Sequence, residues 1–523
     1  MISALTNSLR LARAGYVFAR EGVFSQVDPT LLPVPGRIAL RIAGLISRPG
    51  KDNQAGRLAA ALTRLGPTYV KLGQFLATRP DVVGVSIARS LESLQDRMPA
   101  FPHAQAVAIV EQAFGQPIDK TFASFGPSVA AASIAQVHRA EVKTPTGLRP
   151  VAVKVLRPGI ERRFNIDQEA FAFAARHAEQ LSAEARRLRL VETVATLQRS
   201  VALEMDLRLE AAALSEMAEN AKDDPGFRVP EIDWDRTTKE VLTLEWIDGT
   251  PLTNQAGLVA KNFDLKLLAR IVIQSFLRHA LRDGFFHADM HPGNLFVDDE
   301  GRLVAVDFGI MGRLGLKERR FLAEILYGFI TRNYRRTAEV HFEAGYVPAH
   351  HSVEDFAQAI RAIGEPIHNR AADEISMAKL LTLLFEVTGL FDMRTRPELL
   401  LLQKTMVVVE GVARALDPKL DMWTTAEPVV REWIERNLGP AGRIEGVAEN
   451  AVQLGRFVGQ VPGLLTRGAA LMEQVDAATR NGLVLAPETV ADIGRAEARR
   501  SRATAVALWV IAALLAYIAF LIK

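Results

Sequence analysis

One segment, residues 285–309, restricts the possible folds more than any other part of the chain. Asp289 and Asn294 are five residues apart within HADMHPGN, and Asp307 follows eighteen residues after Asp289, at the end of the apolar run LVAVDFG. Apolar runs alternate here with turn-forming residues, so the pattern predicts a loop, a strand, a tight turn at residues 298–301 and a second strand. The fold must therefore present these polar side chains beside two short strands.

The spacing of these polar residues is typical of the HxDxxxxN and DFG motifs of kinases. Phosphoryl transfer requires a carboxylate that orients the nucleophile, and Asp289 is the candidate catalytic residue. It also requires oxygen ligands for magnesium, and Asn294 and Asp307 supply them because a hard cation prefers oxygen. The two motifs at this spacing predict an enzyme that uses ATP and Mg²⁺.

Two other interpretations of the segment remain open at this point. The first is an ordinary turn rich in Asp, Pro and Gly that carries no chemistry. The second is a metal site, because His287, Asp289 and His291 alternate and alternate residues on a strand share a face, so that the three could ligate zinc. The downstream DFG favours phosphoryl transfer over both.

A lysine within an apolar strand is the second informative feature. Lys154 lies in VAVKV, which is similar to the kinase strand whose lysine contacts the α- and β-phosphates of ATP. A lysine in such a strand needs a carboxylate partner, and Glu210, in a charged helical run downstream, is the candidate. The alternatives are an edge-strand lysine that faces water and a solvated glutamate on a charged helix.

An alanine-rich stretch precedes the lysine strand, where a nucleotide-binding loop is expected. No GxGxxG motif is present there. Alanine lets the backbone approach a ligand closely, although less freely than glycine at positive φ. In isolation the stretch would be a packed turn, but its position shortly before Lys154 predicts contact with the nucleotide. The candidate residues are Ala130, Ala131, Ala132, Ser133, Ile134, Ala135, Gln136, Val137 and His138.

Composition excludes several classes of function. The 523-residue chain has 63 basic and 60 acidic residues and a formal net charge of +3, which does not suggest a nucleic-acid partner. It has no cysteine, which rules out disulfides, thiolate metal sites, iron–sulfur clusters and cysteine catalysis. Hydrophobic residues make up 49% of the chain, so it is not a disordered protein.

The two termini differ in character. Residues 503–522 form an uncharged apolar run, long enough as a helix to span the hydrocarbon core of a bilayer. Four arginines between residues 495 and 502 precede it and only Lys523 follows, so the positive-inside rule predicts a single span with the rest of the chain in the cytoplasm. A buried helix is the alternative. Residues 3–24, interrupted by three arginines, predict an amphipathic helix.

Between the termini, the periodicity of apolar residues changes several times. It is helical over residues 36–115, strand-like over 121–156 with a hairpin turn at 144–150, and helical over 158–220. Two short strands are expected within residues 229–247, followed by an apolar helix over 265–283. From residue 312 onward the pattern is again helical, to about residue 475.

This order of elements predicts an α+β protein with a two-lobed, protein-kinase-like fold. The predicted parts are an N-terminal helical extension (1–120), a kinase-like N-lobe with inserted helices (121–250), a helical C-lobe (251–440), a helical juxtamembrane region (441–502) and a transmembrane helix (503–522).

Taken together, the motifs resemble the UbiB family of atypical kinases, and in particular its bacterial branch. The family's KxGQ signature is present at Lys71, Gly73 and Gln74, and the resemblance covers about residues 60–435. The alanine-rich loop, VAVK, HADMHPGN, PELLLLQKTMVVVEG and LDMW fit the same family, and the pattern continues at Arg79, Asp81, Leu94, Gln95 and Asp96. Two features depart from it: one membrane segment is found rather than two, and Met290 replaces the usual proline.

The resemblance implies that the KxGQ helices lie over the active site of a protein that binds Mg–ATP and supports ubiquinone biosynthesis at a membrane. The implied gate pairs Lys71, Gly73 and Gln74 with Glu204 and Asp206, which form an ELD-like motif. The implied ATP-binding residues are the alanine-rich loop, Lys154, Glu210, Glu245 and Ile247.

The residues themselves argue against a peptide substrate. Ala288 stands where a kinase carries the arginine that contacts a phosphorylated activation loop. After Gly309 the chain is expected to enter a helix, residues 312–329, without an APE motif or a long activation segment. ATP hydrolysis is therefore an alternative to protein phosphorylation.

The leading hypothesis is an atypical kinase or ATPase anchored in the cell inner membrane with its catalytic part in the cytoplasm. The expected partners are membrane lipid, polyprenyl-phenol or quinone intermediates and other ubiquinone-synthesis proteins, with no nucleic acid. One alternative is a small-molecule kinase of the aminoglycoside or choline kinase class, which shares the HxDxHPGN loop. The other is a non-catalytic pseudokinase scaffold for the ubiquinone-synthesis enzymes.

Overall fold

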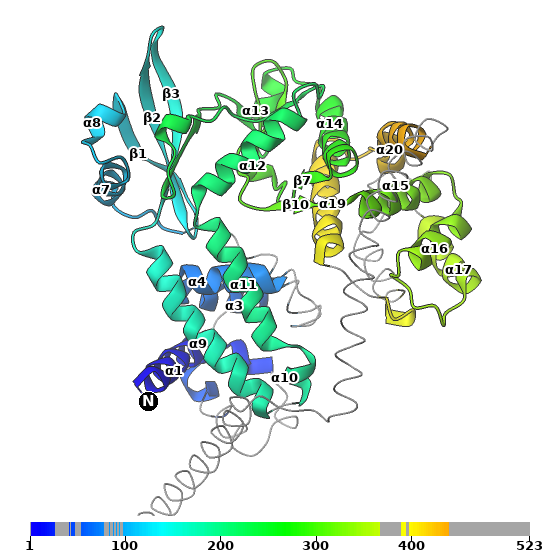
Figure 1. The fold of residues 1–523 in the computed structure, drawn as a ribbon, viewed down its shortest axis with the longest axis horizontal. Coiled ribbons are helices and arrows are strands. Elements are labelled where there is room, and N and C mark those ends of the chain that lie inside the picture. Colours follow the sequence, from blue (N-terminus) through cyan, green and yellow to red (C-terminus); the bar gives the residue numbers. More distant parts are fainter. Residues whose placement is uncertain are drawn as a thin grey trace, which may run out of the picture. The chain divides into compact units, whose positions relative to one another are not determined.

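In the computed structural model, residues 1–435 form one compact unit, to which nearly all of the described residues belong (Figure 1). The predicted juxtamembrane and transmembrane regions lie outside the described residues. No described helix has the length and apolar character needed to cross a bilayer. The described residues are 2–26, 41, 43–47, 54–77, 83, 87, 90–91, 94, 98–181, 183–366, 387, 389–393 and 397–438.

The small lobe is built on the predicted hairpin (Figure 1). Strands β2 (Ala135–Thr144) and β3 (Gly147–Leu156) pair antiparallel along their full length around a two-residue turn. Strands β1 (Ser124–Ala131) and β5 (Val241–Glu245) complete an antiparallel sheet in the order β1-β2-β3-β5. The hairpin is confirmed, although the strands extend further into the predicted turn than expected.

Side chains alternate between the two faces of β3. Val151, Val153 and Val155 are fully buried, in a cluster that includes Val110 of helix α7 (His103–Phe114). Helix α8 (Ile118–Thr121) joins α7 to the sheet. Because successive residues of a strand point to opposite faces, Lys154 projects from the face opposite this core. The hydrophobic pattern of β3 therefore determines where the lysine points.

The predicted charged helical stretch after the hairpin consists of four helices, of which α9 is the longest. Helices α1 and α4 of the N-terminal extension pack against α9, and Tyr69 meets Phe171 edge to face at 5.0 Å. Helix α4 also contacts α11. The helices of this region are α1 (Ile2–Arg20), the 3₁₀ turn Val23–Gln26, α3 (Gln54–Leu65), α4 (Pro67–Ala77), α9 (Ile160–Leu181), α10 (Ala183–Arg187), α11 (Leu190–Glu204) and α12 (Leu207–Asn220).

Short strands carry the predicted catalytic segment. Strand β7 pairs with β10, and a second sheet has the order β4-β9-β8-β6. The predicted turn at residues 298–301 joins β8 to β9, as expected. The strands are β4 (Phe227–Arg228), β6 (Thr250–Pro251), β7 (Phe285–His287), β8 (Leu295–Val297), β9 (Leu303–Ala305) and β10 (Met311–Arg313).

Helices make up the rest of the described chain, and α19 packs against α14. The aromatic residues Tyr334, Phe356 and Phe391 belong to a separate core cluster formed around α16 and α17. The helices are α13 (Gln255–Ala260), α14 (Leu265–Arg278), α15 (Leu316–Ile330), α16 (Tyr334–Glu343), α17 (Val353–Gly364), α19 (Pro397–Leu416) and α20 (Met422–Leu438).

Three boundaries differ from the predictions. Only β5 lies within residues 229–247, because Ile232 makes a single bridge to Leu244 and a 3₁₀ turn (Trp234–Arg236) follows it. The helix expected to reach residue 283 ends at Arg278 and continues as a π-helical turn, His279–Asp283. Strand β10 precedes α15, because its pairing with β7 overrides the local helical pattern.

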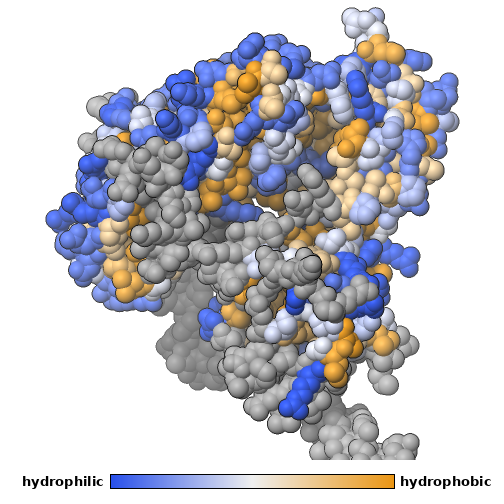
Figure 2. All heavy atoms as spheres, turned by 180° about the vertical axis from the view of Figure 1, so that it is seen from behind, coloured by the Kyte–Doolittle hydropathy of each residue, from blue (hydrophilic) through white to orange (hydrophobic). Residues whose placement is uncertain are grey.

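Large apolar side chains that remain exposed are spread over many elements. Leu9 of α1, Val129 of β1, Leu148 of β3 and Leu203 of α11 are all more than half exposed. On the face drawn in Figure 2, hydrophobic patches are interrupted by hydrophilic residues. Scattered apolar residues of this kind are normal for a folded surface and do not by themselves mark a binding site.

Candidate nucleotide-binding and phosphoryl-transfer site

Three charged side chains converge at the centre of the site. The Nζ atom of Lys154 donates to Oε1 and Oε2 of Glu210 at 2.7 and 2.9 Å, and to Oδ1 of Asp307 at 3.3 Å. The lysine comes from β3, the glutamate from α12, and the aspartate follows β9. The structure thus brings together residues up to 153 positions apart in the sequence, and it places the predicted carboxylate beside the lysine.

Lys154 and Asp307 stabilise each other's charged forms, whereas burial and the nearby Asp307 raise the pKa of Glu210. Burial lowers the pKa of Lys154, but the carboxylates of Asp307 and Glu210 outweigh that effect and raise it. Burial raises the pKa of Asp307, but Lys154 and the Gly309 amide, which donates to Oδ1 at 3.1 Å, bring it well below its usual range. Lysine and aspartate therefore both remain charged at neutral pH. Asp307 keeps 45% of its side chain exposed, so its oxygens are accessible to a cation.

Hydrogen bonds within the catalytic loop hold Asp289 beside Asn294. The Asn294 amide group donates to the carbonyl oxygen of Asp289 at 3.2 Å and to its Oδ2 at 3.4 Å. The carbonyl of Asn294 accepts the Val306 amide at 3.0 Å, next to Asp307. A 3₁₀ turn, Pro292–Asn294, provides this geometry, and the Nδ1 atom of His291 accepts the Gly293 amide at its start. The loop and the end of β9 therefore form one site.

The geometry of the described residues does not favour the zinc alternative for this segment. The Nδ1 atom of His287 accepts the amide of Asp289, and burial lowers the pKa of His287, so the ring is a neutral imidazole. Its ring packs beside Phe308 at 4.9 Å. Within the described part of the chain, the ligand atoms of His287, Asp289 and His291 do not gather into a possible metal site. His287 instead fixes the catalytic loop.

The alanine-rich stretch spans the end of β1, a turn at residues 132–134 and the start of β2, and its contact with the nucleotide stays a prediction. The Ala132 amide donates to the carbonyl of Ala135 at 2.8 Å. The Arg157 guanidinium donates to the carbonyl of Ala132 at 2.8 and 2.9 Å and to the carbonyl of Pro99 at 2.9 Å. Sequence reasoning missed Arg157, although it lies three residues after the predicted lysine. These hydrogen bonds from Arg157 hold the turn in place.

Two predicted loop residues, Gln136 and His138, have their side chains in a buried network. Gln136 Oε1 accepts the Phe101 amide at 3.0 Å, and its Nε2 lies 2.9 Å from His138 Nε2. Burial lowers the pKa of His138, and its Nδ1 atom lies 2.9 Å from the carbonyl of Gly126. The neutral ring therefore donates from Nδ1 and accepts at Nε2. The side chains of Gln136 and His138 are used in hydrogen bonds that hold the loop. If these two residues contact ATP, they do so through their backbone atoms.

Glu245 and Ile247 lie where β5 leaves the small lobe. Both carboxylate oxygens of Glu245 accept from Arg228, at 2.9 and 3.1 Å, and Arg228 also donates to Asp298 at 2.9 Å. The Glu245 side chain therefore ties β5 to β4 and to the β8–β9 turn. A role in ATP binding for Glu245 stays a prediction. The carboxylate is already paired with Arg228, so the predicted contact would be made by the backbone of Glu245.

The KxGQ gate is partly assembled as the resemblance implied. Lys71 of α4 forms an ion pair with Glu204 of α11 at 2.5 Å, with side chains only 10% and 13% exposed. Asp206 caps the N-terminus of α12 and pairs with Arg208 at 2.7 Å, which lowers the pKa of Asp206. Glu204 is thus the residue of this motif that holds the gate lysine. Arg79, Asp81, Gln95 and Asp96 lie outside the described residues.

Gly73 allows the gate helix to pack closely. A Cβ atom at this position would lie 2.7 Å from Leu62 Cδ1 and 2.7 Å from Leu94 Cδ2. We expect Gly73→Ala to lower the free energy of unfolding by about 1–3 kcal/mol, because overpacking outweighs the helix propensity gained. Urea denaturation measures the effect. Gly411→Ala is the matched control, because no atom lies within 4 Å of its Cβ position in α19, and equal stabilities of the two variants would contradict the packing role.

Two further contacts that the sequence did not reveal fix the catalytic strand. The fully buried Thr405 hydroxyl of α19 shares its proton between the carbonyl of Ala288, at 3.1 Å, and that of Leu401 in its own helix, at 2.8 Å. Buried Asp224, just after α12, accepts from His279 at 2.9 Å and from Arg282 at 2.5 Å in the π-helical turn before β7. Burial raises the pKa of Asp224, but these two partners lower it to about 2. Both contacts join segments that no local pattern connects.

Comparison with known proteins decides the family. Residues 93–341 match the ABC1 atypical kinase-like domain, and residues 360–421 match the UbiB helical domain. A Marinobacter nauticus protein named "Probable protein kinase UbiB" is 40% identical over 450 residues, which cover 85% of this chain and 82% of that protein. The chain belongs to the UbiB family of atypical kinases.

A second curated relative agrees with this membership. A protein of Azotobacter vinelandii with the same name is 41% identical over 412 residues, which cover 78% of this chain and 76% of that protein. A solved structure of Rv3197 with erythromycin from Mycobacterium tuberculosis is 24% identical, with a TM-score of 0.46, and covers 72% of this chain and 95% of that chain. The match to the UbiB helical domain includes helix α19 and its Thr405, which contacts the carbonyl of Ala288.

Proposed function

We propose that this UbiB-family protein is an ATP-dependent atypical kinase or ATPase that supports ubiquinone biosynthesis at a membrane. The observation that carries the proposal is the convergence of Lys154, Glu210 and Asp307 beside the Asp289–Asn294 loop. Buried charges are costly unless they are paired or take part in chemistry, and here a buried lysine lies between two carboxylates at the edge of an aspartate-bearing loop.

The residues fit Mg–ATP by their chemistry. Lys154 would contact the phosphates, and Asn294 and Asp307 offer the oxygen ligands that magnesium prefers. Bound Mg²⁺ would neutralise the charge that develops on the transferred phosphoryl group. Asp289, held by Asn294, would orient the attacking oxygen of water or of an acceptor hydroxyl.

ATP hydrolysis or transfer to a small acceptor fits the chain better than transfer to a peptide. Helix α15 begins at Leu316, seven residues after Gly309, and strand β10 occupies three of the residues between them. This leaves no length for an activation segment that would form a peptide-docking platform. The position that pairs with a phosphorylated loop in kinases is Ala288, whose carbonyl accepts from Thr405.

The central test is ATP hydrolysis by the purified full chain in the presence of Mg²⁺. We expect turnover to rise when anionic phospholipid vesicles and a phenolic quinone precursor are added, because the proposed substrates are lipids at a bilayer surface. A radiolabelled γ-phosphate would reveal transfer to the phenol. A protein that binds Mg–ATP but shows no turnover under any of these conditions would support the scaffold alternative instead.

Membrane tethering through residues 503–522 is part of the proposal. Truncation after Gly494 is expected to give soluble protein that binds ATP as the full chain does. It should restore ubiquinone poorly in cells that lack the native protein, because the high local concentration at the membrane is lost. Cell fractionation and quinone extraction measure the two effects. Complete restoration by a demonstrably soluble form would show that tethering is incidental.

A further inference from the structure

Two histidines and an aspartate meet on the helical part of the chain, outside the nucleotide site. The Nε2 atoms of His350 and His351 lie 3.8 and 3.3 Å from the same oxygen, Oδ2 of Asp392. The three ligand atoms all lie within 4.8 Å of one another. The residues come from two segments: the turn before α17 and the short segment around residue 391.

The two printed distances to Asp392, 3.8 and 3.3 Å, are near the ligand spacing of a tetrahedral metal site. Nitrogen and oxygen ligands lie about 2.0–2.1 Å from Zn²⁺, so two ligands of a tetrahedron are roughly 3.3 Å apart. The two distances to Asp392 are therefore close to those that a bound ion would impose. His350 and Asp392 are each about two-thirds exposed, so an ion has access and water can occupy the fourth position.

The ligand-bearing segments are anchored in a packed core, which makes the arrangement more than a chance surface contact. Phe391, next to Asp392, is buried against Phe356 at 4.9 Å, and the His351 ring lies 5.3 Å from Phe391. Val347, three residues before His350, is buried in the same cluster. The ligands therefore extend from positions that the aromatic core already holds.

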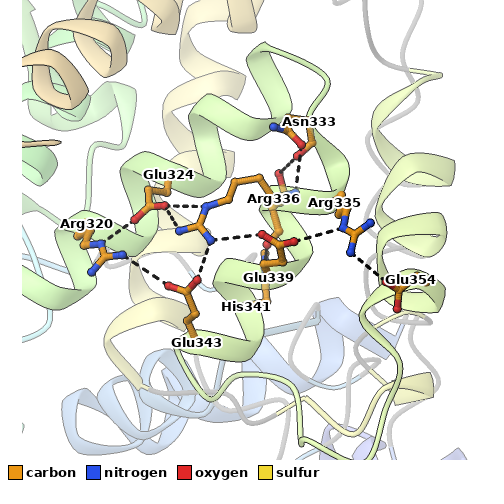
Figure 3. A network of polar contacts seen from close by, with 10 residues as sticks. Arg320, Glu324, Asn333, Arg335, Arg336, Glu339, His341, Glu343 and Glu354 are labelled. Atoms are coloured by element: carbon orange, nitrogen blue, oxygen red, sulfur yellow. Dashed lines mark hydrogen bonds and ion pairs between the residues drawn. The ribbon is translucent and has the colours of Figure 1, made fainter. Parts of the chain in front are cut away.

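An ion-pair network joins the helices that precede and follow the His350–His351 turn (Figure 3). Arg336 of α16 pairs with Glu324 of α15 and with Glu343 at 2.5 and 2.6 Å. Arg335 links α16 to α17 through Glu354 at 3.4 Å. These contacts connect α15, α16 and α17, and the last two helices flank the His350–His351 turn.

We propose that His350, His351 and Asp392 form a binding site for a divalent transition-metal ion, Zn²⁺ in the first instance. Imidazole and carboxylate ligands suit zinc, whereas magnesium and calcium prefer oxygen alone. The ion would join two segments 41 residues apart and so stabilise the α17 region against local opening. The site is independent of the nucleotide site and of the proposed function.

The test is metal binding by the full chain in detergent, stripped with chelator and free of nucleotide. We expect Zn²⁺ to raise the unfolding temperature of the native protein, and Co²⁺ to give the intense visible absorption of a tetrahedral site. The double variant His350→Gln/Asp392→Asn changes only exposed side chains. It should bind Zn²⁺ at least about tenfold more weakly and lose the visible Co²⁺ band.

The single variant His351→Ala should also weaken Zn²⁺ binding and lose the visible Co²⁺ band. The matched control is His177→Gln, a change at an exposed histidine of α9. The control should bind Zn²⁺ and Co²⁺ as the native protein does. Equal Zn²⁺ affinity in the native protein and the double variant would overturn the proposal. So would a native protein that gains no thermal stability from Zn²⁺ and shows only the weak Co²⁺ absorption of an octahedral ion.

Discussion

Asp289→Asn is expected to remove ATP turnover while leaving Mg–ATP binding intact. The asparagine keeps the shape of the side chain and can still contact Asn294, which lies 3.4 Å from Oδ2. It cannot accept a proton from the attacking oxygen, and loss of a general base typically costs about 10²–10⁴ in rate. Steady-state hydrolysis measures turnover, and thermal stabilisation by Mg–ATP measures binding.

The matched control for this prediction is Asp299→Asn, which makes the same chemical change at an exposed turn residue that pairs with Lys261. It should leave both turnover and binding at native values. If Asp289→Asn retained native turnover in a preparation free of contaminating ATPase, the catalytic assignment would fail and a scaffold role would gain support.

Lys154→Met is expected to weaken Mg–ATP binding strongly and also to destabilise the fold. The nucleotide loses its phosphate contact, and charged hydrogen bonds of this kind contribute about 1.5–3 kcal/mol each, which corresponds to roughly 10- to 150-fold in affinity. Glu210, with its side chain 7% exposed, is left without its cation, and breaking a buried pair from one side typically costs about 3–5 kcal/mol. Calorimetric titration and urea denaturation measure the two effects.

A second variant separates the structural loss from the loss of binding. Lys154→Met/Glu210→Met removes both charges, so it should regain much of the lost stability without regaining Mg–ATP binding. Asp307→Asn should weaken Mg–ATP binding while leaving the Lys154–Glu210 pair in place. Native Mg–ATP affinity in the double variant would remove Lys154 from the nucleotide site.

Sequence patterns predicted those parts of the fold whose signals are local. The hairpin, the catalytic loop and the strand that carries Lys154 follow from turn residues, apolar alternation and motif spacing, and the structure confirms them. Strand β10 was missed because it depends on pairing with β7, a segment more than twenty residues away, and not on its own residues. The boundary of α14 was misplaced because a π-helical turn has no compositional signature.

The same difference between local and long-range signals applies to the residues of the site. Glu210 could be predicted because a lysine in an apolar strand requires a carboxylate. Arg157, Thr405 and Asp224 could not, because each acts on a backbone carbonyl or on a side chain that only the folded chain brings near. The three alternating residues 287, 289 and 291 suggested zinc, but the first of them instead accepts a hydrogen bond from a backbone amide two residues away.

The junction between α11 and α12 has a thermodynamic consequence. Glu204 holds the N-terminal helices through Lys71, and six residues later Glu210 holds the lysine of the nucleotide site. If the two ion pairs are coupled across this junction, the coupling free energy is the same in both directions. A ligand that changed nucleotide affinity by acting on the Lys71–Glu204 pair would then be bound more or less tightly by the same factor once nucleotide is present.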